Sequence, residues 1–161
     1  MPAAEPPATP SWRVSAPEHR LSARILIADD NSVARTTIHA LLDWHSFQVC
    51  GEAKDGNEAI EKVIELKPDI ILLDINMPGM NGVRAAYEIR RISPATKIVF
   101  LTIHDTPAVM VGLRVWSHGF VTKSATGTEL IPTLNRLVGT PDKKPPAKPA
   151  KSKSRRAAAG K

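Results

Sequence analysis

Residues 69–82 read DIILLDINMPGMNG, an apolar run that meets an acidic residue and then a turn. Four consecutive apolar residues, Ile70–Leu73, are typical of a strand in a parallel sheet that is covered on both faces. Asp74 follows this run directly, and the Met-Pro-Gly sequence at 77–79 ends any regular structure three positions later. A carboxylate is costly to bury, so its place at the end of such a strand indicates a function.

Four further apolar runs accompany this strand, at 25–28, 49–53, 98–101 and 119–122. Stretches with apolar residues three and four positions apart alternate with them, at 33–42, 59–66, 83–90, 109–116 and 130–138. This is the spacing of amphipathic helices. Strands and helices that alternate in this way predict an α/β fold in which helices cover both faces of a doubly wound parallel sheet.

Residues that favour helix starts precede the predicted helices. They are Ser32, Asp55, Thr106 and Thr126, the last with Glu129 at capping-box spacing. Pro107 follows Thr106 at the first helical position, where proline is tolerated best. Pro132 lacks a backbone N–H, so we expect the last helix to start late, near Thr128, or to bend.

The two ends of the chain differ from its middle in composition. Residues 1–22 contain five prolines and few apolar side chains, and residues 140–161 consist largely of Pro, Ala, Lys and Arg. Neither segment can bury enough apolar surface to fold alone. We therefore expect one folded domain at residues 23–139, between a disordered Pro-rich segment and a disordered basic tail.

The positive charge is concentrated in the tail. The chain of 161 residues carries a net charge of +6 at pH 7. Residues 141–161 hold eight Lys or Arg and one Asp, a net charge of +7, which leaves −1 for residues 1–140. Such a tail can bind nucleic-acid phosphates weakly and without sequence preference, or it can be a solvated extension. Both interpretations stay open.

Cysteine content and hydropathy indicate the compartment. Cys50 is the only cysteine, which rules out a disulfide within the chain and favours a reducing environment. No apolar run approaches the ~20 residues that span a bilayer, and the N-terminus lacks the basic and apolar regions of a signal peptide. These features predict a cytoplasmic protein without membrane contact.

Five side chains with related chemistry follow the predicted strands. They are Asp29, Asp30, Asp74, Thr102 and Lys123. Since ligands of open parallel sheets bind beyond the carboxyl ends of the strands, all five are expected at one edge of the sheet. Any one of these residues alone is most often a helix cap or a turn residue. That interpretation does not readily account for all five of them at the same edge of the sheet.

The three carboxylates would repel one another unless a cation lay between them. Mg²⁺ suits such an oxygen-rich site, because it binds one or two carboxylates and keeps several waters. Lys123 adds a positive charge and Thr102 a hydrogen-bond donor, and both suit a phosphoryl group. Together these residues predict a site at which an aspartate carries a phosphoryl group.

In its motifs the sequence resembles the receiver domain of bacterial two-component response regulators, over about residues 23–139. The matching stretches are ILIADDN (25–31), DIILLDINMPGMNG (69–82), IVFLTIHD (98–105) and GFVTKS (119–124). The last two are most similar to regulators whose output is a helix-turn-helix DNA-binding domain. The resemblance implies a flavodoxin-like fold with five strands in the order 2-1-3-4-5 and five helices.

The resemblance also implies a role for each site residue. Asp74 would be the phosphoacceptor that attacks the phosphohistidine of a sensor kinase. Mg²⁺ would be bound by Asp30, by Asp74 and by the backbone carbonyl of Asn76, with Asp29 acting mostly through water.

Three further residues would respond to phosphorylation. Thr102 would donate to a phosphoryl oxygen and shift toward it, and Lys123 would pair with the phosphate. Phe120 occupies the position of an aromatic switch residue, which moves inward with Thr102. An ordinary core aromatic is equally compatible with that position.

The sequence departs from the family pattern at several points. Ile103 is bulkier than the small residue usual after the threonine, which would narrow access to the phosphoryl group. Trp116 replaces a small residue, and it lies with Pro132 in the region that the family uses for dimerisation and output. After residue 139 only the basic tail follows, so we expect a stand-alone receiver.

The resemblance therefore predicts a signalling switch and not an enzyme. Its partners would be a sensor histidine kinase or phosphotransfer protein and a downstream effector, with a homodimer on phosphorylation as a further expectation. One alternative is a nucleic-acid-associated protein that acts through its tail. A Mg²⁺-dependent phosphatase of the haloacid dehalogenase type ranks below both, because the stretch 74–76 lies on the third strand and has no second acid.

Overall fold

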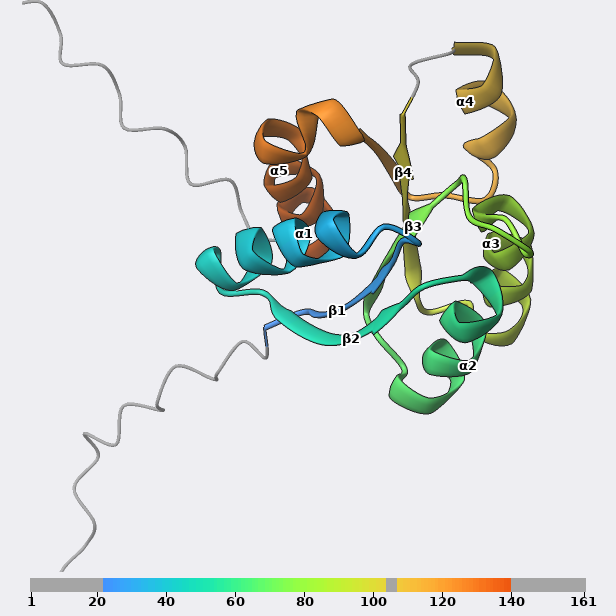
Figure 1. Cartoon of the computed structure of the whole chain (residues 1–161), viewed down its shortest axis with the longest axis horizontal. Coiled ribbons are helices and arrows are strands. Elements are labelled where there is room, and N and C mark those ends of the chain that lie inside the picture. The colour runs from blue at the N-terminus through green and yellow to red at the C-terminus, as the bar shows by residue number, and fades with distance from the viewer. Residues whose placement is uncertain (1–21, 104–106, 140–161) are drawn as a thin grey trace, which may run out of the picture.

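The computed structural model describes residues 22–103 and 107–139. They form a five-stranded parallel sheet between two layers of helices (Figure 1). The strands are β1 (Arg24–Ala28), β2 (Gln48–Ala53), β3 (Ile70–Asp74), β4 (Lys97–Thr102) and β5 (Gly119–Thr122). The helices are α1 (Ser32–Trp44), α2 (Gly56–Leu66), α3 (Gly82–Ile92), α4 (Pro107–Leu113) and α5 (Thr126–Val138), with a 3₁₀ turn η1 (Lys123–Ala125) before α5.

The strand order is β2-β1-β3-β4-β5, and all four pairings are parallel. The predicted flavodoxin-like topology is therefore confirmed. The most deeply buried strand is β3, which lies at the centre of the sheet and has no residue more than 1% exposed. Its continuous apolar sequence has a simple cause, since both faces of a central parallel strand are covered.

Two apolar clusters fill the space on either side of the sheet. One face carries α2 and α3, where Ile71 and Leu73 pack against Val63 and Ile89 among others. The opposite face carries α1 and α5, which lie together in Figure 1. Alternate residues of β3 thus enter different clusters, and the sheet holds both helix layers in fixed positions.

The edge strand β2 contains an irregularity. Ile25 pairs with Val49, whereas the next residue of β1, Leu26, pairs with Gly51. Cys50 is the extra residue, and its thiol donates a hydrogen bond to the carbonyl of Ile25 at 3.4 Å. This is a β-bulge, which increases the local twist of the edge.

Two of the predicted helix starts are wrong. Asn31, not Ser32, caps α1, because its side chain accepts hydrogen bonds from the backbone N–H groups of Val33 and Ala34. Thr126 does not cap α5, since its hydroxyl donates to the preceding carbonyls of Thr122 and Lys123. The cap at Asp55 and the start of α4 at Pro107 are confirmed.

The position of Pro132 also differs from the expectation. Helix α5 begins at Thr126 and continues through Pro132, so it does not start late. The proline removes a hydrogen bond to the carbonyl of Thr128. Both residues are exposed, so water can satisfy that carbonyl.

The predictions for the chain ends fall outside the described residues, apart from Ser22, and Thr106 also lies outside them. The domain boundaries stay predictions. Within the described part of the chain, no helix has both the length and the apolar character needed to cross a membrane.

Candidate functional site

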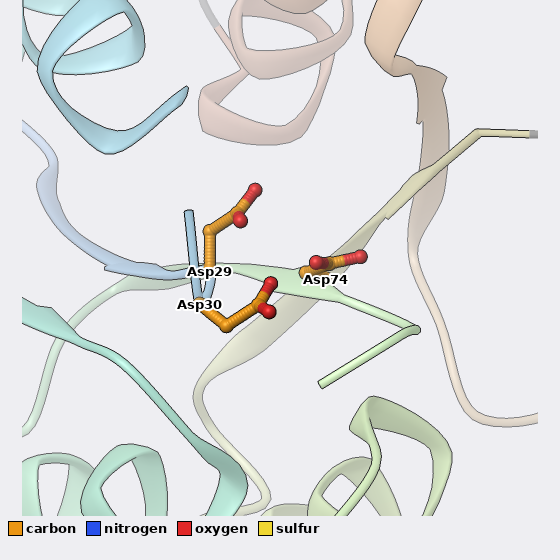
Figure 2. Close-up of side chains that lie close together, drawn as sticks. All are labelled: Asp29, Asp30 and Asp74. Carbon is orange, nitrogen blue, oxygen red and sulfur yellow. The ribbon is translucent and has the colours of Figure 1, made fainter. Parts of the chain in front are cut away.

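Three carboxylates meet at the carboxyl edge of the sheet (Figure 2). Asp29 and Asp30 follow β1, and Asp74 ends the neighbouring strand β3. The register pairs Ala28 with Leu73, so the residues that come next in the two strands lie side by side. One carboxylate oxygen from each aspartate lies within 4.8 Å of the other two.

Two of these carboxylates are buried. Asp29 is 0% exposed and Asp74 is 1% exposed, whereas Asp30 is exposed. Each buried side chain accepts a hydrogen bond from the backbone N–H two residues later, Asp29 from Asn31 at 2.9 Å and Asp74 from Asn76 at 3.1 Å. These bonds fix the side chains but leave excess negative charge in the site.

Among the described residues, Lys123 is the one cation that forms an ion pair with these acids. Its Nζ lies 2.8 Å from Asp29 Oδ2 and 2.9 Å from Asp74 Oδ2, so it bridges β1 and β3 from the end of β5. Three ionised carboxylates and one ammonium give the group a net charge of −2. The site therefore favours a further cation.

The pKa values of the bridge reflect burial and this charge imbalance. Burial raises the pKa of Asp74 above its usual value, and the charge of Asp29 adds to that, against the hydrogen bonds from Lys123 and Asn76. Burial alone would lower the pKa of Lys123, but its hydrogen bonds to Asp29 and Asp74 outweigh burial and raise it. The ammonium is therefore firmly charged at neutral pH.

The donor set fits Mg²⁺. Oxygens bound to one Mg²⁺ at ~2.0–2.1 Å are up to about 4.2 Å apart, close to the 4.8 Å spread of the three aspartates. The exposed Asp30 leaves the site open to solvent, and Mg²⁺ usually keeps several waters. The backbone of Asn76 lies beside Asp74, as its hydrogen bond to Asp74 Oδ1 requires.

The turn after β3 brings the chain close to Asp74. Gly82, the first residue of α3, donates its N–H to the carbonyl of Ile75 at 3.0 Å. A Cβ at Gly82 would lie 2.0 Å from the carbonyl oxygen of Asp74, a distance that no side chain can adopt. Gly79, at φ +74°, lets the turn reverse direction. The sequence pattern did not single out Gly82, because its constraint comes from the folded backbone.

Arg35 is a second residue that the sequence did not single out. From α1, its Nη1 donates to the backbone carbonyl of Asp29 at 2.8 Å, and its Nε pairs with Glu52 of β2 at 3.0 Å. His39, one turn later, contacts the other oxygen of Glu52 at 2.8 Å. A cation near the N-terminus of a helix interacts unfavourably with the helix dipole. The position of Arg35 near the start of a predicted helix was therefore the one sign in the sequence that this residue has a specific partner.

Thr102 and Phe120 lie on the two strands beyond β3. Thr102 ends β4 and is 7% exposed, one residue after the partner of Asp74 in the register. Phe120 is partly buried, and its ring lies 5.7 Å from that of Phe100, centroid to centroid. The structure thus places Thr102 beside the acid cluster and Phe120 against the core.

Two of the unusual residues have clear surroundings. Ile103, directly after Thr102, is 57% exposed. Trp116 packs edge-to-face on Tyr87 of α3, with ring centroids 5.3 Å apart, and is partly buried against the core. The tryptophan therefore joins the α4–β5 connection to α3.

Known proteins match this chain in sequence and in fold. A sequence profile described as the response regulator receiver domain matches residues 25–135. The chain belongs to this family. The receiver domain is 35% identical to the chemotaxis protein CheY of Thermotoga maritima, over 71% of this chain and 96% of CheY. It is 37% identical to the response regulator GacA of Pseudomonas viridiflava, over 71% of this chain.

Solved structures agree. A two-component response regulator of the LuxR family from Aurantimonas sp. SI85-9A1 superposes with a TM-score of 0.69 at 30% identity, over 73% of this chain and 85% of that one. The receiver of Thermotoga maritima CheB gives a TM-score of 0.67 at 29% identity, over 74% of this chain and 98% of that one. The match covers only 54% of GacA, so this chain spans about half the length of such relatives.

Proposed function

We propose that the chain acts as a response regulator, whose receiver domain accepts a phosphoryl group on Asp74 from a sensor histidine kinase or a phosphotransfer protein. The observation that supports this most directly is the position of Asp74. Its carboxylate ends the central strand, lies among two further acids, and is already 2.9 Å from the ammonium of Lys123.

In the proposed reaction, a carboxylate oxygen of Asp74 forms a bond to phosphorus. The bond between phosphorus and the donor's histidine nitrogen breaks, and that nitrogen keeps the electron pair. Lys123, which now pairs with Asp74 Oδ2, is close enough to pair with an oxygen of the transferred group. Thr102, at the end of the adjacent strand, would donate its hydroxyl to another.

Mg²⁺ would be held by Asp30, Asp74 and the backbone carbonyl of Asn76, with Asp29 acting through water. The ion would supply the positive charge that lets two anions, the carboxylate and the phosphoryl group, approach each other. The net charge of −2 around Lys123 supports this assignment, because a second cation would bring the group to neutrality.

The output would be a change in protein contacts. If Thr102 moved toward the phosphoryl group, its side chain would vacate space at the end of β4. The partly buried Phe120 on the adjacent strand β5 would then move inward to fill that space. The surface formed by α4, β5 and α5 would then differ between the two states, for an effector or for a second copy of the chain.

Incubation of the full-length protein with [³²P]acetyl phosphate and Mg²⁺ tests the assignment. We expect about one acyl phosphate per chain, released by hydroxylamine, and no label with EDTA or in Asp74→Asn. Asp43→Asn, which alters a carboxylate that is 62% exposed, is the matched control and should label normally. Full labelling of Asp74→Asn would contradict the phosphoacceptor assignment.

The same experiment separates a switch from a phosphatase. A receiver accumulates the acyl phosphate up to one equivalent, whereas an enzyme releases many equivalents of inorganic phosphate. We propose that the chain is not an enzyme, so turnover of acetyl phosphate should stay close to the hydrolysis rate of the acyl phosphate.

A second candidate function rests on the tail. The net charge of +7 at residues 141–161 favours contact with nucleic-acid phosphates, which phosphorylation of the domain could regulate. This segment lies outside the described residues, and its charge alone supports the proposal.

A further inference from the structure

A cavity of about 540 Å³ lies between α4, β5 and α5, at the start of β5, whereas Lys123 follows the end of that strand. Its walls are Met110, Arg114, Ser117, His118, Gly119, Phe120 and Arg136. The lining therefore contains two guanidinium groups and no carboxylate. It shares no residue with the acid cluster.

Three polar side chains of this cavity have no partner among the described residues. The side chains of Arg114 and Arg136 form no ion pair or hydrogen bond with any other described residue. Ser117 Oγ is buried and likewise has no hydrogen-bond partner in the described structure. A buried hydroxyl without a partner is rare in folded proteins.

Gly119 lies beside one of the arginines. A Cβ at this position would lie 3.9 Å from Arg136 Nη2 and 3.0 Å from Thr133 Cγ2. The guanidinium of Arg136 thus lies over the start of β5, at the cavity wall, and does not extend into solvent away from the domain. Arg114 reaches the same cavity from the end of α4.

Further positive charge lies behind the cavity. Arg90 Nη1 is 3.4 Å from His118 Nε2, and His118 Nδ1 accepts a hydrogen bond from the N–H of Ile98 at 3.0 Å. Burial, with the charges of Arg90 and Lys97, lowers the pKa of His118, so the ring is neutral at pH 7. No acid offsets these cations within the lining.

One acidic residue lies nearby. Glu129 lines an adjoining cavity of about 580 Å³ that shares Met110, Phe120 and Arg136 with the first. Its carboxylate forms no ion pair with Arg136. The end of the groove that holds Arg114, Ser117 and Arg136 therefore keeps its positive potential.

We propose that this cavity binds a small molecule that carries a phosphate or carboxylate group next to an apolar or aromatic group. Guanidinium forks bind such oxyanions with two parallel hydrogen bonds. Met110 and Phe120 offer apolar contact for the remainder of the ligand. The volume lies within the ~300–1,000 Å³ typical of small-molecule sites.

The site is tested by NMR titration of the ¹⁵N-labelled full chain with phenylphosphonate and, separately, with inorganic phosphate. EDTA removes metal ions that could bind the probes at the acid cluster, and a constant ionic strength excludes shifts caused by the added salt. We expect saturable shifts at residues 114–120 and at Arg136, with tighter binding of phenylphosphonate. Arg114→Met and Arg136→Met should each weaken binding about tenfold.

Arg84→Met is the matched control, because Arg84 is an exposed arginine on α3 outside the cavity. It should bind both probes as the unaltered protein does. Equal affinity for phenylphosphonate and inorganic phosphate would contradict the proposed apolar contact with Met110 and Phe120. Shifts that do not saturate, or equal losses in Arg84→Met and Arg136→Met, would overturn the site itself. The dispersion of the amide shifts tests whether each variant is folded.

Discussion

Arg35 Nη1 donates a hydrogen bond to the backbone carbonyl of Asp29 across 2.8 Å. The same guanidinium is anchored by Glu52 on β2, so the loop that carries Asp29 and Asp30 is tied to both α1 and the edge of the sheet. This tie acts on the backbone of the acid cluster and not on its carboxylates. It therefore controls where the carboxylates lie without changing their charge.

Arg35→Ala should weaken metal binding about tenfold, at the lower end of the loss seen when an outer partner of a ligand is removed. Titration of the unphosphorylated protein with Mn²⁺, followed by the EPR signal of the free ion, measures this directly. Arg35→Lys should recover part of the affinity. Unchanged affinity in Arg35→Ala, with normal affinity in Arg84→Ala, would contradict the positioning role.

The pair of Glu52 with His39 and Arg35 predicts a pH-dependent stability. The hydrogen bond from His39, followed by that from Arg35, lowers the pKa of Glu52 in the folded state. A depressed carboxyl pKa stabilises the fold above the unfolded-state value of ~4.3, and this contribution disappears as the pH falls through the folded-state value.

Glu52→Gln should therefore lower the melting temperature at pH 7 and have less effect as the pH falls below ~4. Thermal unfolding from pH 3 to pH 7.5 measures the difference. Glu61→Gln, at an exposed position on α2, should change little at any pH. A constant difference for Glu52→Gln across this range would show that its charge is not the cause.

Gly82→Ala should destabilise the fold by about 3 kcal/mol, the upper end of the usual cost of overpacking. Its Cβ would overlap the carbonyl of Asp74, so the start of α3 and the end of β3 must separate. Gly127→Ala is the control, since nothing lies within 4 Å of a Cβ at that position. Because alanine has the higher helix propensity, this change should raise the free energy of unfolding by at most about 1 kcal/mol. Urea unfolding curves give both values, and equal stability of the two variants would disprove the close approach.

The basic tail should bind DNA weakly and independently of sequence. With a net charge of +7 at residues 141–161 and a slope near −0.9 per neutralised phosphate, affinity should fall by orders of magnitude between ~50 and ~200 mM salt. Gel shifts of the full chain and of a chain ending at residue 140 measure this. Phosphorylation of Asp74 should be equal in both. Equal DNA binding by the two chains would assign the binding to the domain instead.

The sheet could be predicted from the sequence because its signal is strong. Continuous apolar runs mark β1, β3 and β4, whereas the runs of β2 and β5 are interrupted by Gly, Glu or Thr. The strand ends differ from the predicted ones by one residue at most. The convergence of Asp29, Asp74 and Lys123 follows from the same pattern, since strand ends of a parallel sheet meet at one edge.

Other features depend on contacts that a local pattern does not contain. Asn31 and Ser32 have similar capping preferences, and only the geometry of the loop decides that Asn31 is the cap. Gly82 and Arg35 act on the backbone carbonyls of Asp74 and Asp29, which are eight and six positions away. A residue of this kind is recognised only once the chain has folded around its target.

The bulge at Cys50 affects how the domain meets other molecules at high concentration. Edge strands present unpaired N–H and C=O groups, onto which a strand from another chain can add. In β2 the extra residue interrupts the regular spacing of these groups midway along the strand. The opposite edge, β5, has only four residues. Neither edge therefore offers a long, even template, which protects the domain against sheet-to-sheet aggregation.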